Sequence, residues 1–181
     1  MDPFLTNEYG QEMARAMKML AQDPKTLFLY QNYGRIGWTL TEVPEEQKID
    51  MPITEDMQMG MALGLSLADF VPVSCYARWN FLLLAANQLV NHIDKLEKMS
   101  NGGYRPGVII RTAVGSTIPL YPGCQADGDY TAAFRLMMTN VDVVKLYGAE
   151  DIVPAYSKAL REAKKGRSTL VIEIGNEYEN I

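Results

Sequence analysis

The residue with the clearest chemical potential is Glu55, a carboxylic acid that the sequence is expected to bury beside a ligand. The segment Pro52-Ile53-Thr54-Glu55 places Glu55 in the first turn of a predicted helix, directly after a short apolar stretch. Small and apolar residues continue at helical spacing: Met57, Gly60, Met61, Gly64, Leu65 and Ala68. A carboxylate at the mouth of an apolar helix suits a buried hydrogen bond to a ligand nitrogen. The alternative is a helix-capping acid, since acids favour the positive end of the helix dipole.

The other reactive residue types form no recognisable catalytic or metal-binding pattern. His92 is the only histidine, and a lone histidine on a predicted helix is usually structural. Cys75 and Cys124 have no CxxC spacing, which is typical of reduced thiols in a cytosol. With so few ligand types close together, we expect no metal bound by the side chains of this chain alone.

Apolar periodicity and turn signals predict the helices and strands that must position Glu55. Thr54 is the expected N-cap of the helix that carries Glu55. Predicted helices cover 7–21, 54–67, 80–99, 130–138 and 151–165. Predicted strands cover 26–30, 69–76, 107–111, 141–146 and 169–174, with long loops at 31–46 and 113–129.

Apolar strands alternate with amphipathic helices, a pattern that predicts an α/β fold. We expect residues 1–181 to form a single three-layer domain, with a mainly parallel sheet and helices on both faces. Ligands of such sheets bind at the carboxyl ends of the strands. The loops carrying Gln31, Glu55 and Gln125 are therefore expected to gather there.

Composition excludes several classes of function. The chain has 181 residues, of which 48% are hydrophobic and 22% charged, as in ordinary globular proteins. A formal charge of −5 and a pI near 4.9 do not indicate the basic surface that nucleic-acid binding requires. The longest apolar run, 81–86, is too short to cross a bilayer. The segment MDPFLTNEYG lacks the features of a signal peptide, so we expect a cytoplasmic protein without membrane partners.

Two longer stretches together resemble one family. They are IDMPITEDMQMGMALGLSLADFVPV and NFLLLAANQLVNHIDKLEKMSNGG. They resemble the pyrimidine-binding domain of thiamine-diphosphate enzymes, in particular the N-terminal domain of the beta subunit of 2-oxoacid dehydrogenases and its transketolase-like relatives. Glu55 and Phe81 show the same separation as the family's activating glutamate and ring-stacking phenylalanine, and no gap is needed.

The resemblance implies roles for these residues. Glu55 would bond the aminopyrimidine ring of thiamine diphosphate and activate the cofactor, and Phe81 would stack on that ring. Ile53 would supply an apolar contact to the ring, although core packing would explain Phe81 and Ile53 as well. Gln31 and Gln125 are candidates to face the substrate.

A second implication concerns the helix that carries Glu55. Gly60, Gly64 and Ala68 form a small-residue stripe on it. In the family this helix crosses a subunit interface. Close packing of the stripe against the chain's own sheet is the alternative, and the sequence leaves both open.

The departures from the family pattern are also informative. Ala126 stands where family members carry a substrate-facing histidine, and Gln31-Asn32 replaces an acidic residue. The segment Asp127-Gly128-Asp129 does not match the family's Gly-Asp-Gly motif for the cofactor diphosphate. The resemblance therefore implies that Mg²⁺ and the diphosphate are held by a partner chain, an alpha-like subunit in a heterotetramer. The isolated chain is expected to be capable of forming a homodimer.

Three functions remain open at this point. The first is the pyrimidine-binding subunit of a split enzyme that cleaves or forms a carbon–carbon bond next to a carbonyl. Transketolase-like two-carbon transfer, carboligation and 2-oxoacid decarboxylation all fit this description, so the enzyme would be a transferase or lyase. The second is a non-catalytic assembly or regulatory partner. The third is a fragment of a longer beta subunit, although the sequence itself predicts no C-terminal domain.

Overall fold

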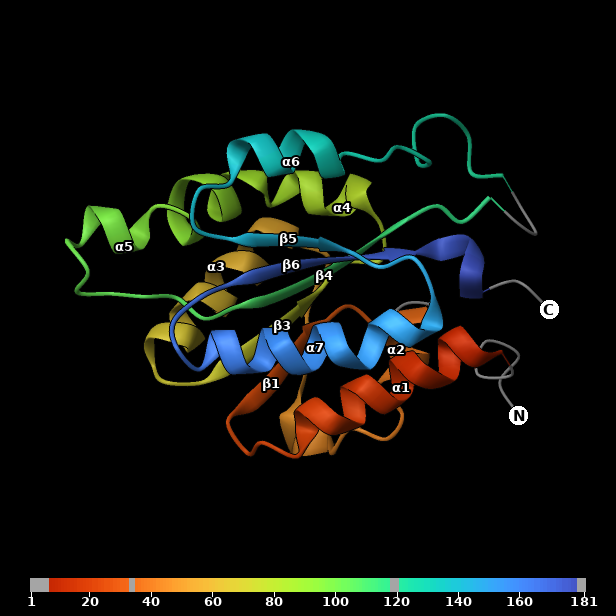
Figure 1. Cartoon of the computed structure of the whole chain (residues 1–181), viewed down its shortest axis with the longest axis horizontal. Coiled ribbons are helices and arrows are strands. Elements are labelled where there is room, and N and C mark those ends of the chain that lie inside the picture. Colours follow the sequence, from red (N-terminus) through yellow and green to blue (C-terminus); the bar gives the residue numbers. More distant parts are fainter. Residues whose placement is uncertain (1–6, 33–34, 118–120, 179–181) are drawn as a thin grey trace.

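A parallel six-stranded sheet forms the centre of the molecule (Figure 1). The computed structural model describes residues 7–32, 35–117 and 121–178; the segment 1–6, expected not to begin a signal peptide, lies outside them. The strand order is β2-β1-β3-β4-β6-β5, and every strand pair is parallel. The strands are β1 (Thr26–Tyr30), β2 (Lys48–Asp50), β3 (Val71–Cys75), β4 (Ile109–Val114), β5 (Asp142–Lys145) and β6 (Thr169–Ile174).

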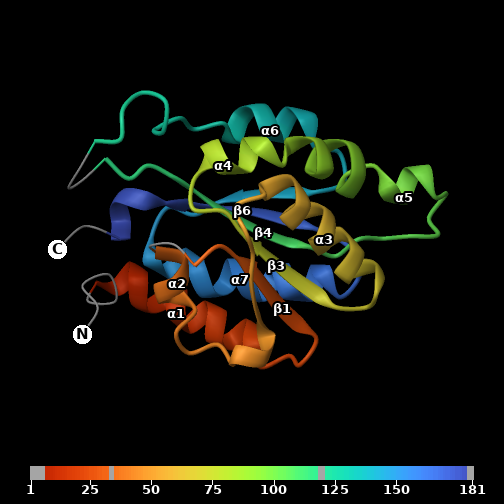
Figure 2. The same ribbon diagram turned by 180° about the vertical axis from the view of Figure 1, so that it is seen from behind.

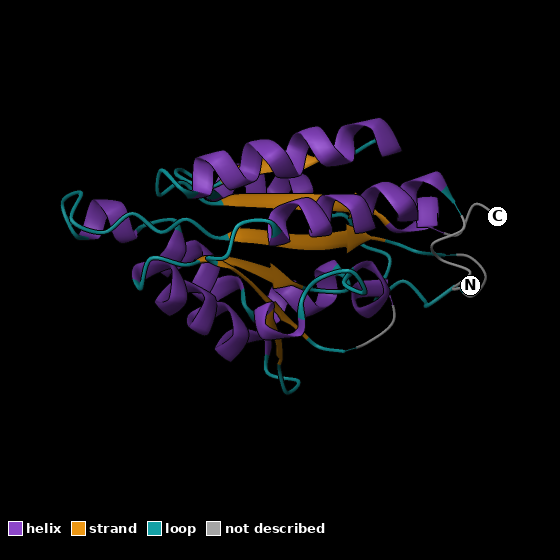
Figure 3. Cartoon of the chain, turned by 90° about the horizontal axis from the view of Figure 1, so that it is seen from below, coloured by secondary structure: helices purple, strands orange, loops and turns teal. Residues whose placement is uncertain are grey.

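Helices cover both faces of this sheet, which confirms the predicted α/β class (Figure 3). The α-helices are α1 (Glu8–Ala21), α2 (Arg35–Thr39), α3 (Glu55–Leu67), α4 (Trp79–Leu84), α5 (Leu96–Met99), α6 (Thr131–Met137) and α7 (Ala149–Ala163). Shorter turns are the 3-10 helices η2 (Glu45–Gln47) and η4 (Gly175–Tyr178) and the π-helix η3 (Gln88–Ile93).

Two apolar cores lie on opposite sides of the strands. Successive strand residues point to opposite faces, so Phe28 joins the core under α1, α2 and α7, while Leu29 joins the core under α3, α4 and α6. Ile109 and Ile110 in β4 divide in the same way. Strands buried on both faces read as continuous apolar runs, which is why they were recognisable in the sequence. Figure 2 shows α3 and α4 on the side opposite α1 and α7.

The predicted loop 31–46 is partly wrong. It contains the helix α2 and runs into η2, and the edge strand β2 then follows and pairs with β1 through Ile49 and Leu29. A three-residue edge strand makes few ladder bonds, so its sequence carries little strand signal.

The predicted continuous helix 80–99 is also wrong in detail. The chain divides into α4, η3 and α5, and the Asp94 N–H bonds the Leu89 carbonyl, five residues back (3.0 Å). The Asp94 carboxylate accepts N–H bonds from Thr139 (2.9 Å), Asn140 (2.7 Å) and Val141 (3.0 Å). These bonds to a distant segment fix Asp94 in place, and the helix widens around it.

A buried ion pair and its hydrogen bonds join four elements inside the first core. Arg111 in β4 donates to both carboxylate oxygens of Glu173 in β6, at 2.6 and 3.1 Å. Arg111 also donates to the Thr39 hydroxyl at the end of α2 (2.9 Å), and the Tyr156 hydroxyl of α7 donates to Glu173 (2.9 Å). Both charges are therefore paired and bonded, as burial requires.

The described chain ends meet at one corner of the molecule. Asn7 is the N-cap of α1, and its side chain accepts the Gly10 N–H (2.8 Å). The same side chain donates to the Glu177 carbonyl (2.8 Å), and the Tyr9 hydroxyl accepts the Ile174 N–H (3.0 Å). Among the helices of the described ranges, none has the length and apolar character needed to cross a membrane.

Candidate functional site

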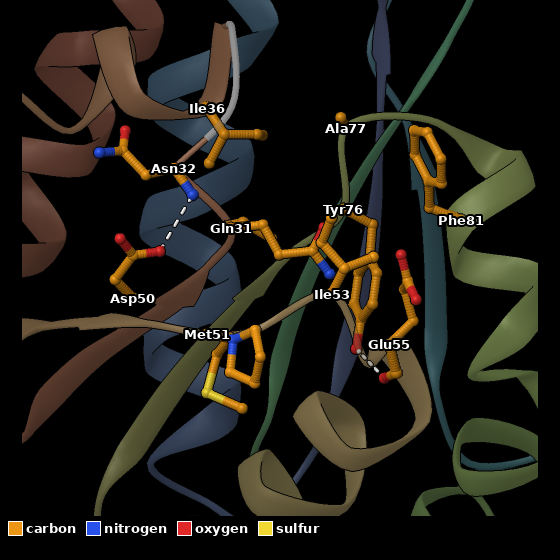
Figure 4. Close-up of a pocket in the computed structure, with 12 residues that line it drawn as sticks. Gln31, Asn32, Ile36, Asp50, Met51, Ile53, Glu55, Tyr76, Ala77 and Phe81 are labelled. Atoms are coloured by element: carbon orange, nitrogen blue, oxygen red, sulfur yellow. Dashed lines mark hydrogen bonds between the residues drawn. The ribbon is translucent and has the colours of Figure 1, made fainter.

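A cavity of about 390 Å³ lies where β1, β2 and β3 end and α3 begins (Figure 4). Open parallel sheets place ligands at this edge. The described lining residues are mainly apolar or uncharged, with two carboxylates and no cationic side chain. They are Gln31, Asn32, Ile36, Asp50, Met51, Pro52, Ile53, Glu55, Cys75, Tyr76, Ala77 and Phe81.

Glu55 is buried at this cavity. Only 4% of the residue is exposed, and its Oε1 atom is buried without a hydrogen-bond partner. In Figure 4 the carboxylate rises from the first turn of α3 toward Phe81. A buried carboxylate oxygen without a donor is costly, so this oxygen at the cavity wall is an acceptor available to a donor that enters the cavity.

Glu55 is not held by the predicted N-cap. Thr54 occupies the N-cap position, but its side chain makes no capping bond and donates to the Pro52 carbonyl instead (3.3 Å). The start of α3 is tied to the sheet by other residues: the Tyr76 hydroxyl, at the end of β3, donates to the Glu55 main-chain carbonyl (3.3 Å).

Phe81 and Ile53 supply apolar surface beside the carboxylate. Phe81 comes from α4 and is 38% exposed, while Ile53 precedes α3 and is 82% exposed. Both line the cavity, so the core-packing alternative does not describe either of them. An open aromatic face and an exposed aliphatic side chain suit a flat, apolar ring.

The two glutamines predicted to face substrate are placed differently. Gln31 follows β1 and lines the cavity. Gln125 does not line it; it is exposed, and its main-chain carbonyl accepts a bond from the Asn80 side chain, next to Phe81. Ala126 also lies outside the lining, and its carbonyl accepts a bond from Arg78 (3.4 Å). The structure therefore brings Gln31 to Glu55 and leaves Gln125 outside the lining.

Sequence reasoning missed several lining residues. Tyr76 and Ala77 follow β3 directly, and the rule of carboxyl strand ends would have found them. Asp50 accepts the Asn32 N–H (3.1 Å) at the end of β2. That pair was hidden because β2 itself was not predicted.

Two titrating groups of the cavity wall are strongly affected by burial. Burial raises the pKa of the Cys75 thiol to about 12, and the nearby Arg111 only partly opposes this. Burial likewise raises the pKa of the Tyr76 phenol well above its ordinary value. Both groups are protonated near neutral pH, so Tyr76 is a hydrogen-bond donor there.

The remaining sequence candidates lie away from the cavity. His92 is exposed on η3 and does not line the cavity, and its ring nitrogen lies 3.5 Å from the Asn87 side chain. A Cβ added at Gly60 or Gly64 would meet no atom within 4 Å, so the stripe does not pack closely on the chain's own sheet. Asp129 caps Thr131 and pairs with Lys145, which accounts for it as a structural residue.

Fold and site together define an α/β domain of six parallel strands that presents a buried carboxylate in an apolar cavity at the carboxyl edge. No family model matches the sequence. The curated relatives include pyruvate dehydrogenase E1 component subunit beta of Rickettsia bellii, which is 26% identical over 158 residues, 87% of this chain and 48% of that protein. The mitochondrial counterpart of Drosophila melanogaster is 29% identical over 65% of this chain and 32% of that protein.

A third relative, the mitochondrial subunit of Chaetomium thermophilum, is 31% identical over 65% of this chain. Among solved structures, a split gene transketolase described as an inactive beta4 tetramer superposes with a TM-score of 0.68, covering 91% of this chain and 50% of that one at 19% identity. The chain spans about half the length of the first relatives it matches. The resemblance to the beta-subunit and transketolase-like family is thus confirmed, and the fold is transketolase-like.

Proposed function

We propose that this chain is the pyrimidine-binding subunit of a split thiamine-diphosphate enzyme, which cleaves or forms a carbon–carbon bond next to a carbonyl. The unpartnered Oε1 atom of Glu55 at the cavity carries this proposal, because an aminopyrimidine ring offers the donor that this oxygen lacks. The relatives named as beta subunits and the fold of a split transketolase support it.

The cavity residues have distinct tasks in this proposal. When bound, thiamine diphosphate supplies a carbon nucleophile that adds to carbonyl groups. Glu55 holds a proton shared between its carboxylate and a ring nitrogen, and its burial keeps water away from that proton. Phe81 and Ile53 would hold the ring through apolar contacts, since both line the cavity and both are exposed.

The diphosphate end is assigned to another polypeptide. The described cavity lining bears two carboxylates and no cation, so it would repel a diphosphate. We therefore propose an alpha-like partner chain that holds Mg²⁺ and the diphosphate, in a heterotetramer. The neighbouring reading frame is the place to look for it, as a chain with a Gly-Asp-Gly motif. The cytoplasmic location remains a prediction.

A non-catalytic assembly partner is the second candidate. Ala126 favours it, because the family's histidine is absent and its position lies outside the described cavity lining. Retention of a buried, unpartnered Glu55 favours the enzyme, since an assembly protein would gain stability by replacing it.

Glu55→Gln separates the two candidates. The amide keeps the volume but cannot cycle a proton, so with partner and Mg²⁺ we expect turnover to fall by at least about two orders of magnitude. Cofactor affinity should stay within about tenfold, or roughly 1.4 kcal/mol. Exchange of the thiazolium proton, followed by NMR in heavy water, should slow in parallel.

The matched control is Asp56→Asn. Asp56 stands in the same first turn and is exposed, so this variant removes the same charge from the helix start without touching the cavity. It should behave as wild type. If Glu55→Gln exchanges the thiazolium proton at the wild-type rate, Glu55 is a helix-start acid and the enzyme proposal fails.

A further inference from the structure

A chain of buried polar side chains runs beneath the first turn of α3 and ends on Glu55. The Ser74 hydroxyl donates to the Tyr76 hydroxyl (3.1 Å), and the Tyr76 hydroxyl donates to the Glu55 carbonyl (3.3 Å). Gln58, one turn after Glu55, lies with its Nε2 atom 3.2 Å from the Ser74 hydroxyl oxygen. Gln58, Ser74 and Tyr76 are all buried.

The direction of this chain is fixed by its surroundings. Gln58 Nε2 donates to the main-chain carbonyls of Leu29 (3.2 Å) and Cys75 (3.0 Å), which can only accept. The amide therefore cannot be turned around, even though its Oε1 atom is left without a partner. Tyr76 remains protonated because burial raises its pKa, so its hydroxyl has a proton to give to Glu55.

These bonds join α3 to the sheet at two strand ends. Leu29 lies in β1 and Cys75 ends β3, so Gln58 holds α3 to both strands. Tyr76, directly after β3, holds the residue whose carboxylate faces the cavity. The Thr54 side chain makes no capping bond, so the side-chain hydrogen bonds that join this turn to the sheet come from Gln58 and Tyr76.

We propose that Gln58, Ser74 and Tyr76 are positioning residues that set the place of the Glu55 carboxylate. A catalytic effect of this positioning rests on the proposed function, whereas its effect on the rigidity of the first turn of α3 can be measured on the protein alone. Small displacements of a positioned catalytic group reduce rates strongly, whereas the apolar contacts that bind a flat ring are non-directional. Loss of this positioning should therefore slow activation of the cofactor while changing its affinity little.

The first experiment measures amide hydrogen exchange in the first turns of α3 by NMR, without cofactor. Tyr76→Phe removes only the hydroxyl, and we expect exchange of the Met59 amide to become about tenfold faster relative to β4 amides. Tyr104→Phe, at an exposed tyrosine, is the control and should change nothing. Wild-type exchange in Tyr76→Phe would overturn the proposal.

A second pair of variants tests the hydroxyl of Ser74 independently of packing. Ser74→Thr and Ser74→Val add the same bulk to a buried strand position, but only threonine keeps the hydroxyl. Exchange should be faster in Ser74→Val than in Ser74→Thr. Equal amide exchange in the two variants would show that the Ser74 hydroxyl does not stabilise the first turn of α3, and would overturn its proposed positioning role.

The last readout adds the diphosphate-binding partner, Mg²⁺ and cofactor. In Tyr76→Phe we expect cofactor affinity within about threefold of wild type and thiazolium proton exchange about tenfold to a hundredfold slower. If wild type activates the cofactor and Tyr76→Phe does so equally well, the positioning role is rejected. If wild type itself binds no cofactor, the proposed function fails, and the amide exchange data alone decide whether the polar chain holds Glu55.

Discussion

The two cysteines differ sharply in their surroundings, although neither stands in a motif. Cys75 ends β3, is buried and has a pKa raised to about 12 by burial, while Cys124 is exposed in the segment before α6. Thiolate is the reactive form, and the raised pKa keeps Cys75 in its thiol form at pH 8. The native thiols are therefore expected to react at very different rates.

At the residue scale this gives a first prediction. An aromatic disulfide reagent at pH 8 should modify one thiol quickly in the native protein and the second only when the chain is unfolded. Cys124→Ser should abolish the fast phase, and Cys75→Ser should leave it intact. Two fast phases in the native protein would mean that the cavity wall opens far enough to expose Cys75 to reagent and water.

At the element scale, Asp94 joins the helical segment 79–99 to the start of β5. Burial alone would raise the pKa of this carboxyl, but the bonds from Lys95, Asn140 and Thr139 outweigh burial and hold the pKa below its usual value. The unfolded chain therefore binds the proton more tightly. The stabilisation is complete above about pH 4, near the unfolded pKa, and disappears as the pH falls through the folded pKa.

Asp94→Asn tests this contribution. The amide cannot accept all the N–H bonds now made to the carboxylate, so we expect a loss of about 2–3 kcal/mol in the free energy of unfolding at pH 7. The difference from wild type should shrink as the pH falls below about 4. Urea titrations at several pH values measure both effects. Glu42→Gln, in an exposed ion pair with Lys18, should cost less than about 1 kcal/mol.

These elements also show what the sequence could and could not reveal. The helices are recognisable because burial of one face leaves an apolar period of about 3.6 residues, and the strands because burial on both faces leaves continuous apolar runs. The strand β2 is too short to leave one, and the break at Asp94 depends on residues 139–141, far along the chain. Local patterns cannot show such partners.

The candidate site divides in the same way. Glu55 and Phe81 were predicted because their spacing matches a known family, and Ile53 because it stands beside the glutamate as the family's apolar contact does. The place of Tyr76 at a strand end could have been predicted, but its hydrogen bond to Glu55 and those of Gln58 could not, because they form only when β1, β3 and α3 come together. Gln125 was assigned from an aligned loop, and its exposure shows how weakly a loop position fixes the direction of a side chain.

At the scale of the whole molecule, one face carries apolar side chains that the described chain does not cover. Exposed residues on or next to α3 and α4 include Ile53, Met57, Met61, Phe81 and Leu84. Gly60 and Gly64 lie on α3 with no neighbours for an added Cβ. Exposed apolar patches of this kind mark interaction surfaces, and this one adjoins the cavity.

Gly60→Leu tests whether this face assembles. Because the position is open and helical, folding should be unaffected or stabilised by up to about 1 kcal/mol. Assembly with a second copy or with the proposed partner should weaken at least tenfold, since bulk at a close helix contact is not accommodated. Sedimentation velocity measures the assembly and thermal unfolding measures the fold. Ala133→Leu on the exposed side of α6 is the control, and unchanged assembly of Gly60→Leu would place the contact elsewhere.

The contacts between the start of α1 and the segment formed by β6 and η4 carry a consequence for synthesis. Asn7 bonds Glu177 across 170 positions, and Tyr9 bonds Ile174 across 165. The ribosome releases α1 first and β6 last among these elements, so the apolar side of α1, with Met13, Met17 and Leu20, waits without its final neighbours. Contacts of such high sequence separation delay folding. Among the described elements, α1 is thus translated well before its last contacts exist, and its apolar side is the surface available to a chaperone that meets the growing chain.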